Sequence, residues 1–241
     1  MTLSPVIKMS CLGFYVAVFV LVSSAQAEGL KGQFLVTGNI STTGESLASF
    51  NQRFGLTYAP TWAPGTFDYR YERYAEPSFH GQNGAQVNER KVESQLMYSH
   101  PLTEQFSVTA GELDHANRTF RDSYHWAVAG VTFSGEIAPK TTASVAALIE
   151  KRTSGGRAFY DLSAGVEYKP MGEVGLFANA HLYENFGESD VRPTHKREFE
   201  VGVNYYINQR YYAGTSYFRH WQVDDATDRF AVVKVKFGIN F

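Results

Sequence analysis

The sequence predicts an all-β fold, a transmembrane antiparallel up-and-down β-barrel of about twelve strands. The first observation is the final segment, residues 229–241, in which an apolar face alternates with a charged face and the last residue is Phe241. A strand with lipid on one side and water on the other has this pattern. The second observation is that similar two-residue alternation recurs along the chain. The third is an export signal at the start.

Residues 1–27 have the pattern of a secretory signal peptide. Lys8 gives a weakly basic start, an apolar run covers 12–22, and Ala25-Gln26-Ala27 provides the small residues of a cleavage site. We therefore expect residues 28–241 to form one barrel domain in the cell outer membrane of a Gram-negative bacterium. The only cysteine, Cys11, lies in the signal segment, so we expect no disulfide in the mature chain.

Twelve segments alternate in polarity and are bounded by turn residues, which predicts a strand at each. They cover residues 33–41, 47–58, 66–75, 90–99, 104–112, 122–133, 141–151, 158–168, 173–184, 197–207, 210–221 and 229–241. An even number suits a single-chain bacterial barrel, and ten or fourteen strands are the alternatives if a hairpin is miscounted.

The connections between these segments alternate in length. Those after even-numbered segments are short, whereas those after odd-numbered segments include long polar stretches at 76–89, 114–122 and 185–196. This asymmetry is typical of periplasmic turns at one rim and extracellular loops at the other. A soluble β-sandwich also has alternating strands, but the 15% aromatic content and segments of about ten residues favour the barrel.

The face opposite each apolar row is expected to line the lumen. It carries a basic arc and, on the far wall, acidic residues. The predicted pore-lining or substrate-binding residues are Arg53, Arg70, Lys91, Lys234 and Lys236 on the arc, with Glu198 and Glu200 opposite. Cationic side chains would attract an anionic solute.

Two interpretations of this lumen compete. Inward small residues such as Gly55, Gly111, Gly202 and Gly238 are expected to leave room for a narrow water-filled pore. In the alternative, the charges pair across adjacent strands and plug the barrel. Twelve strands lie between the eight that side chains just fill and the sixteen that enclose an open channel.

Passive transport is the function that this pattern favours, with small hydrophilic solutes, among them acidic oligosaccharides, as the cargo. We expect no enzymatic activity, no cofactor and no metal, and a monomer whose partners are outer-membrane lipids and the solute. Without Lys8, the 21 remaining basic residues and 24 acidic ones give a net charge of −3, which predicts no nucleic-acid partner.

Two other functions remain open. A lipid hydrolase would need a nucleophile and a base within hydrogen-bond reach, and Ser123 and His125 share one face of a strand. Their order is Ser-x-His, the reverse of the His-x-Ser found in outer-membrane lipid hydrolases. The third possibility is a non-conducting structural or surface-binding barrel.

Three stretches resemble the oligogalacturonate-specific porins, a family of small outer-membrane barrels that includes sialic-acid porins. They are Asn88–Gly111, with its strand, short turn and strand, Phe67–Glu72, and the closing Lys234–Ile239. The resemblance is mainly architectural. It implies passive uptake of acidic oligosaccharides through a lumen with basic tracks. This chain departs from that pattern because its basic arc is sparse and several acids point inward.

Overall fold

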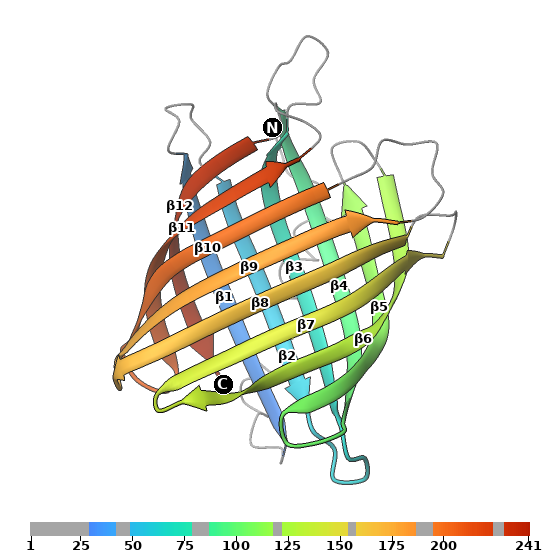
Figure 1. Cartoon of the computed structure of the whole chain (residues 1–241). Coiled ribbons are helices and arrows are strands. Elements are labelled where there is room, and N and C mark those ends of the chain that lie inside the picture. The colour runs from blue at the N-terminus through green and yellow to red at the C-terminus, as the bar shows by residue number, and fades with distance from the viewer. Residues whose placement is uncertain are drawn as a thin grey trace, which may run out of the picture.

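The described residues form a closed antiparallel barrel of twelve strands, as predicted. The computed structural model describes residues 29–41, 49–78, 87–117, 122–153, 158–186, 195–223 and 229–241. The predicted signal peptide, residues 1–27, lies outside them. Each strand pairs with its neighbours in sequence, and β1 pairs with β12, so the sheet has no free edge (Figure 1). The strands are β1 (Leu30–Ser41), β2 (Ser49–Tyr58), β3 (Thr66–Ser78), β4 (Val87–Pro101), β5 (Phe106–Asn117), β6 (Asp122–Ala138), β7 (Thr141–Arg152), β8 (Ala158–Met171), β9 (Val174–Asn185), β10 (His195–Tyr206), β11 (Tyr211–Gln222) and β12 (Arg229–Asn240).

Several strands are longer than predicted, and the long connections are correspondingly shorter. The expected connection 76–89 is reduced at both ends, because β3 and β4 remain paired as far as Ser78 and Val87. Beyond the lipid, both faces of a strand meet water, so pairing continues where the apolar alternation has ended. The turns after the even strands gather at the lower end of the barrel (Figure 1).

The outer face of the barrel is apolar, as the alternation predicted. On β12, Val235 and Phe237 are 53% and 44% exposed on the outside, whereas the side chains of Lys234 and Lys236 are 17% and 15% exposed on the inside. On β8 the outward row is Tyr160, Leu162, Ala164, Val166 and Tyr168. Such a surface is suited to lipid.

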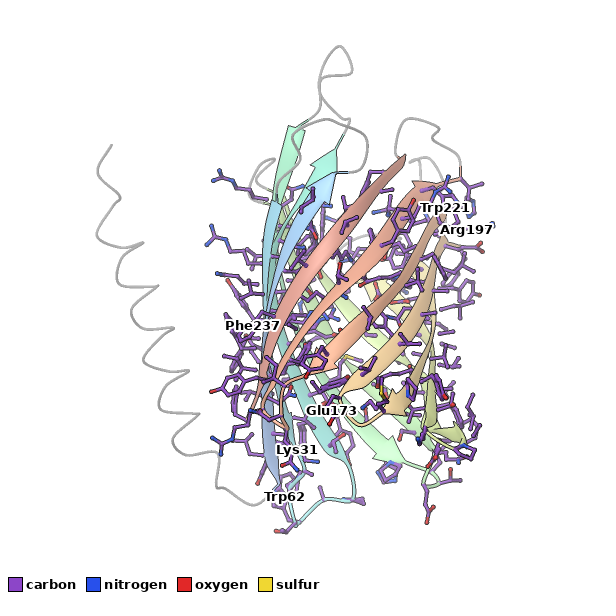
Figure 2. All side chains as sticks on the ribbon, turned by 90° about the vertical axis from the view of Figure 1, so that its left-hand side faces the viewer. Lys31, Trp62, Glu173, Arg197, Trp221 and Phe237 are labelled. Carbon is purple, nitrogen blue, oxygen red and sulfur yellow. The ribbon has the colours of Figure 1, made fainter. Side chains whose placement is uncertain are left out.

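Aromatic residues lie towards both ends of the barrel. Trp62 lies at the end with the short turns, and Trp221 lies towards the opposite end (Figure 2). On the outer face, Tyr160 stacks on Phe186 with ring centroids 3.9 Å apart. Aromatic rings at two levels are typical of the two interfaces of a bilayer.

The last residue of the chain joins β12 to β1. Phe241 and Gly32 exchange two backbone hydrogen bonds of 2.7 and 2.9 Å, and the ring of Phe241 stacks on Phe54 at 6.3 Å. A Cβ atom at Gly32 would lie 2.2 Å from the Phe241 ring, so only glycine leaves that ring its place. The terminal aromatic residue therefore contributes to barrel closure.

The part of the chain that the structure describes contains no helix long and apolar enough to cross a membrane.

Candidate functional site

A cavity of about 450 Å³ occupies the lumen in the half of the barrel that carries the long connections. Five basic and five carboxyl side chains line it, and aromatic rings fill the space between them. The basic ones are Arg53, Arg70, Lys91, Lys196 and Lys234, and the acidic ones are Glu72, Glu93, Glu150, Asp161 and Glu198. The cavity is therefore strongly charged and nearly balanced in sign.

Five of the seven predicted pore residues line this cavity. They are Arg53, Arg70, Lys91, Lys234 and Glu198. The other two, Lys236 and Glu200, are absent from its lining and contact each other nearer the short-turn end. The strand periodicity therefore assigned these side chains to the inner face. It could not show which of them lie at the height of the cavity and which lie below it.

The two arginines of the basic arc differ in their contacts. Arg53 Nη2 lies 2.8 Å from Glu72 Oε2, its direct neighbour across β2 and β3. Arg70 forms no ion pair with the described residues, and its Nε atom is buried without a hydrogen-bond partner there. Arg70 thus lines the cavity without a direct carboxylate contact among the described residues, with the charge of Glu93 nearby.

Glu200 joins the two lysines of β12 instead of facing them from the far wall. Lys234 Nζ donates to Glu200 Oε2 at 3.0 Å, Lys236 Nζ donates to Oε1, and Ser216 Oγ donates to Oε1 at 2.7 Å. The expectation of an acidic wall opposite the lysines is corrected here, because only β11 separates β10 from β12. Charge pairing across neighbouring strands was expected for a plugged barrel, and it is found at this level of the lumen.

A second charged group connects β8 to β11. Imidazole nitrogens of His181 lie 2.5 Å from Asp161 Oδ1 and 3.3 Å from Glu198 Oε2. His220 Nδ1 lies 3.0 Å from the other Glu198 oxygen. These contacts hold Glu198 on the acidic side of the cavity.

Sequence reasoning missed Glu150 on β7. This side chain is 5% exposed, lines the cavity and accepts a 2.9 Å hydrogen bond from the Tyr183 hydroxyl. Its parity with Thr142 and Ser144 placed it on the inner face of a predicted strand. That signal was available, but the apolar run before it, Val145–Ile149, concealed the alternation.

The inward glycines do not simply widen the lumen. A Cβ atom at Gly238 would lie 2.0 Å from the Tyr212 ring, and one at Gly202 would lie 2.8 Å from the Phe177 ring. At Gly55, by contrast, the nearest atom would be 3.9 Å away. The space that these glycines were expected to leave open is therefore partly filled by aromatic rings, which fit only because glycine has no side chain.

Water also reaches the lumen from the short-turn end. Thr142, Ser144 and Asn179 point inward there and are exposed. Between this region and the cavity, Val128 and Ser216 on opposite sides of the lumen are each 3% exposed. The lumen therefore has a polar, hydrated region at each end and a tightly packed level between them.

Ser123 and His125 face outward, away from the lumen. His125 Nδ1 lies 2.7 Å from Asp114 Oδ1, and its Nε2 lies 3.6 Å from Glu112 Oε2. A hollow of about 430 Å³ on this face is lined by residues that include Ser94, Ser123 and His125. Among the described residues no hydrogen bond joins a serine hydroxyl to His125, so a complete catalytic triad is not formed. No group of three or more potential metal-ligating side chains occurs in the described ranges.

No protein-family model and no curated protein sequence matches the chain. Solved structures do resemble it. The KdgM porin in complex with disordered oligogalacturonate has a TM-score of 0.54 at 10% identity, covering 88% of this chain and 99% of that one. The NanC porin has a TM-score of 0.53 at 12% identity, covering 86% and 98%.

An LpxR structure from Salmonella typhimurium is equally similar, with a TM-score of 0.55 at 9% identity over 87% of this chain and 99% of that one. At such low identities these likenesses show the fold. The resemblance to the oligogalacturonate-specific porins is thus architectural, as expected.

Proposed function

We propose that this chain is an outer-membrane channel through which small hydrophilic solutes diffuse passively. The observation that carries the proposal is the polar inner surface that water reaches at both ends of the lumen. A lumen that served only as a structural core would be filled by its own side chains, as in eight-stranded barrels. The apolar outer rows support a position in lipid, with the long connections on the extracellular side. Diffusion needs no cofactor.

The packed level between the two hydrated regions limits the size of the solute. The basic and acidic linings of the cavity are equal in number, which favours a modest charge preference over strong anion selectivity. Acidic oligosaccharides remain one candidate cargo. They are supported by Arg70 in the cavity and by the likeness to the KdgM porin, whose structure was solved with oligogalacturonate.

Swelling of liposomes that contain the refolded protein tests this function directly. Neutral sugars of increasing size should enter at decreasing rates, because the lumen sorts uncharged solutes by width. Liposomes with unfolded protein should not swell.

A matched pair of variants tests whether the sugars pass through the lumen. Asn179 points inward and its neighbour Ala180 points outward, and both are exposed. Asn179→Trp should slow sugar entry, whereas Ala180→Trp should leave it unchanged. Equal rates for both variants and the wild type would exclude a path through this lumen.

A second candidate function is lipid hydrolysis on the outer face. It is favoured by the 2.7 Å contact between His125 and Asp114 beside a hollow that contains two serines. Against it, the free imidazole nitrogen of His125 faces Glu112 instead of a serine. We therefore place it second.

A further inference from the structure

The cavity has two chemically different sides, which come from different strands. Arg53, Arg70 and Lys91 lie on β2 to β4, and Glu150 and Asp161 lie on β7 and β8. In the strand order of the closed barrel these two groups are separated by β5 and β6 in one direction and by β9 to β12 and β1 in the other.

The acidic side is a series of contacts between carboxyl groups and imidazoles. Glu150 lies beside Asp161, Asp161 contacts His181, and His181 shares Glu198 with His220. Glu150 and Asp161 also hydrogen-bond to each other, which requires a proton between the two carboxyl groups.

Glu150 is the member of the group without a basic neighbour. Among the described residues it forms no ion pair, and its hydrogen-bond partners are the Tyr183 hydroxyl and Asp161. Arg152, two positions along the same face, is turned over the ring of Tyr124 at 3.9 Å. Lys196 lines the same cavity but forms no ion pair with Glu150. Glu150 and Asp161 share a proton instead of a cation, and a ligand ammonium group would take the place of that proton.

Aromatic rings flank this carboxylate. Trp126 and Tyr183 both line the cavity, and Phe159 packs between them, at 5.1 Å from Trp126 and 4.4 Å from Tyr183. Carboxylates beside the faces of tryptophan and tyrosine form the environment that binds ammonium groups.

On the basic side the lining holds three cations, Arg53, Arg70 and Lys91, and two carboxylates, Glu72 and Glu93. The charge of Glu93 lies near Arg70, but its carboxylate contacts His115 at 2.9 Å and Tyr74 at 2.7 Å. The Nε atom of Arg70 is buried and has no hydrogen-bond partner among the described residues. A guanidinium group in this state binds a carboxylate readily.

We infer that the cavity binds zwitterions of amino-acid chemistry, with the ammonium group at Glu150 beside Trp126 and Tyr183 and the carboxylate at Arg70. One ligand then takes the place of the proton shared by Glu150 and Asp161 and pairs with the guanidinium group of Arg70. This inference rests on the proposed channel for its physiological meaning, because the ligand would be a solute in transit. Binding itself does not require conduction.

Binding in detergent micelles tests the inference independently of transport. The chain has three tryptophans, so a Trp62→Phe, Trp221→Phe background leaves Trp126 as the only indole reporter. The probes are ω-amino acids of increasing length, from glycine to 6-aminohexanoate, with hexanoate and hexylamine as single-charge analogues. The best ω-amino acid should bind at least about tenfold more tightly than either analogue.

Variants on each side separate the two contacts. Arg70→Gln should weaken the ω-amino acid and hexanoate but not hexylamine, and Glu150→Gln should weaken the ω-amino acid and hexylamine but not hexanoate. The matched controls Arg73→Gln and Glu112→Gln change outward-facing side chains and should leave all affinities unchanged.

Lys196→Met excludes a rival arrangement in which Lys196 is the cation that holds the ligand carboxylate. This substitution should not weaken binding of the ω-amino acid, and a loss of affinity would overturn the assignment of Arg70.

Hexanoate binding as tightly as every ω-amino acid would reduce the site to an anion site and overturn the inference. So would the absence of binding by all probes. If the Glu150→Gln variant does not fold, the inference is tested by the relative affinities of the best ω-amino acid, hexanoate and hexylamine for the protein with an unmodified lumen.

Discussion

The ring of Tyr212 on β11 lies across Gly238 on β12, so close that a Cβ atom at Gly238 would be 2.0 Å from a ring carbon. The two residues are direct partners in the strand register. Tyr212 is 8% exposed and therefore packs in the lumen instead of projecting into water. The glycine is needed for this packing, which also narrows the lumen near the short-turn end.

Gly238→Ala should destabilise the barrel by about 1–3 kcal/mol, because the added methyl overlaps a ring that cannot move freely. The matched control is Gly55→Ala, where the nearest atom to a Cβ would be 3.9 Å away. That substitution should be neutral or slightly stabilising, since alanine loses less entropy than glycine in a strand. Urea unfolding in micelles, followed by heat-modifiable gel mobility, measures both. Equal effects of the two substitutions would contradict the packing described here.

Glu200→Gln should increase the preference of the channel for anions. Lys234 and Lys236 would then lie close together without their shared carboxylate, which now neutralises one of the two charges. A loss of about 1–3 kcal/mol in stability should accompany the change, because a hydrogen bond to a charged group is lost. Reversal potentials in a salt gradient report the selectivity. Glu173→Gln, in an exposed turn, is the control, and an unchanged reversal potential for Glu200→Gln would refute this role of Glu200.

Val235→Arg should impair insertion into lipid vesicles by about 2–4 kcal/mol if this outward residue lies near the middle of the bilayer. Ile137→Arg, close to the turn between β6 and β7, should have an effect of about 0–1 kcal/mol because the interface tolerates charge. Both residues are exposed on the outer face, at 53% and 57%. Folding titrations into vesicles compare them. A larger penalty at Ile137 would place the lipid-facing band at a different height.

Ser123→Ala should leave phospholipid turnover at the background level of the unmodified protein. No hydrogen bond joins Ser123 to His125 in the described structure, and Glu112 occupies the side of the imidazole that a nucleophile would need. A lipase assay in mixed micelles measures the rate. Hydrolysis that disappears in Ser123→Ala or Ser94→Ala would instead support the second candidate function.

The strand pattern could be predicted well because its cause is local. Val235 and Lys236 alternate because lipid and water lie on opposite sides of one strand, and that requirement is visible in any short window. The ends of β3 and β4 were predicted less well. Pairing there continues to Ser78 and Val87 beyond the lipid, where polarity no longer distinguishes the two faces.

The candidate site could be predicted only in part. Periodicity identified Arg70 and Lys234 as inward residues, and both line the cavity. It could not show that Glu200 pairs with Lys236, since this contact depends on which strands lie two apart in the closed sheet. It also could not show that Gly238 supports a ring instead of leaving a gap. Those features depend on side-chain direction and barrel closure.

The most direct test of the central claim is the single-channel conductance of the refolded protein in a planar bilayer with a salt gradient. Discrete opening steps are expected. The anion preference should fall in Arg70→Gln and remain unchanged in Arg73→Gln, because Arg70 faces the lumen and Arg73 faces outward. A silent bilayer, with folding confirmed by heat-modifiable mobility, would contradict the channel and would leave a plugged, non-conducting barrel.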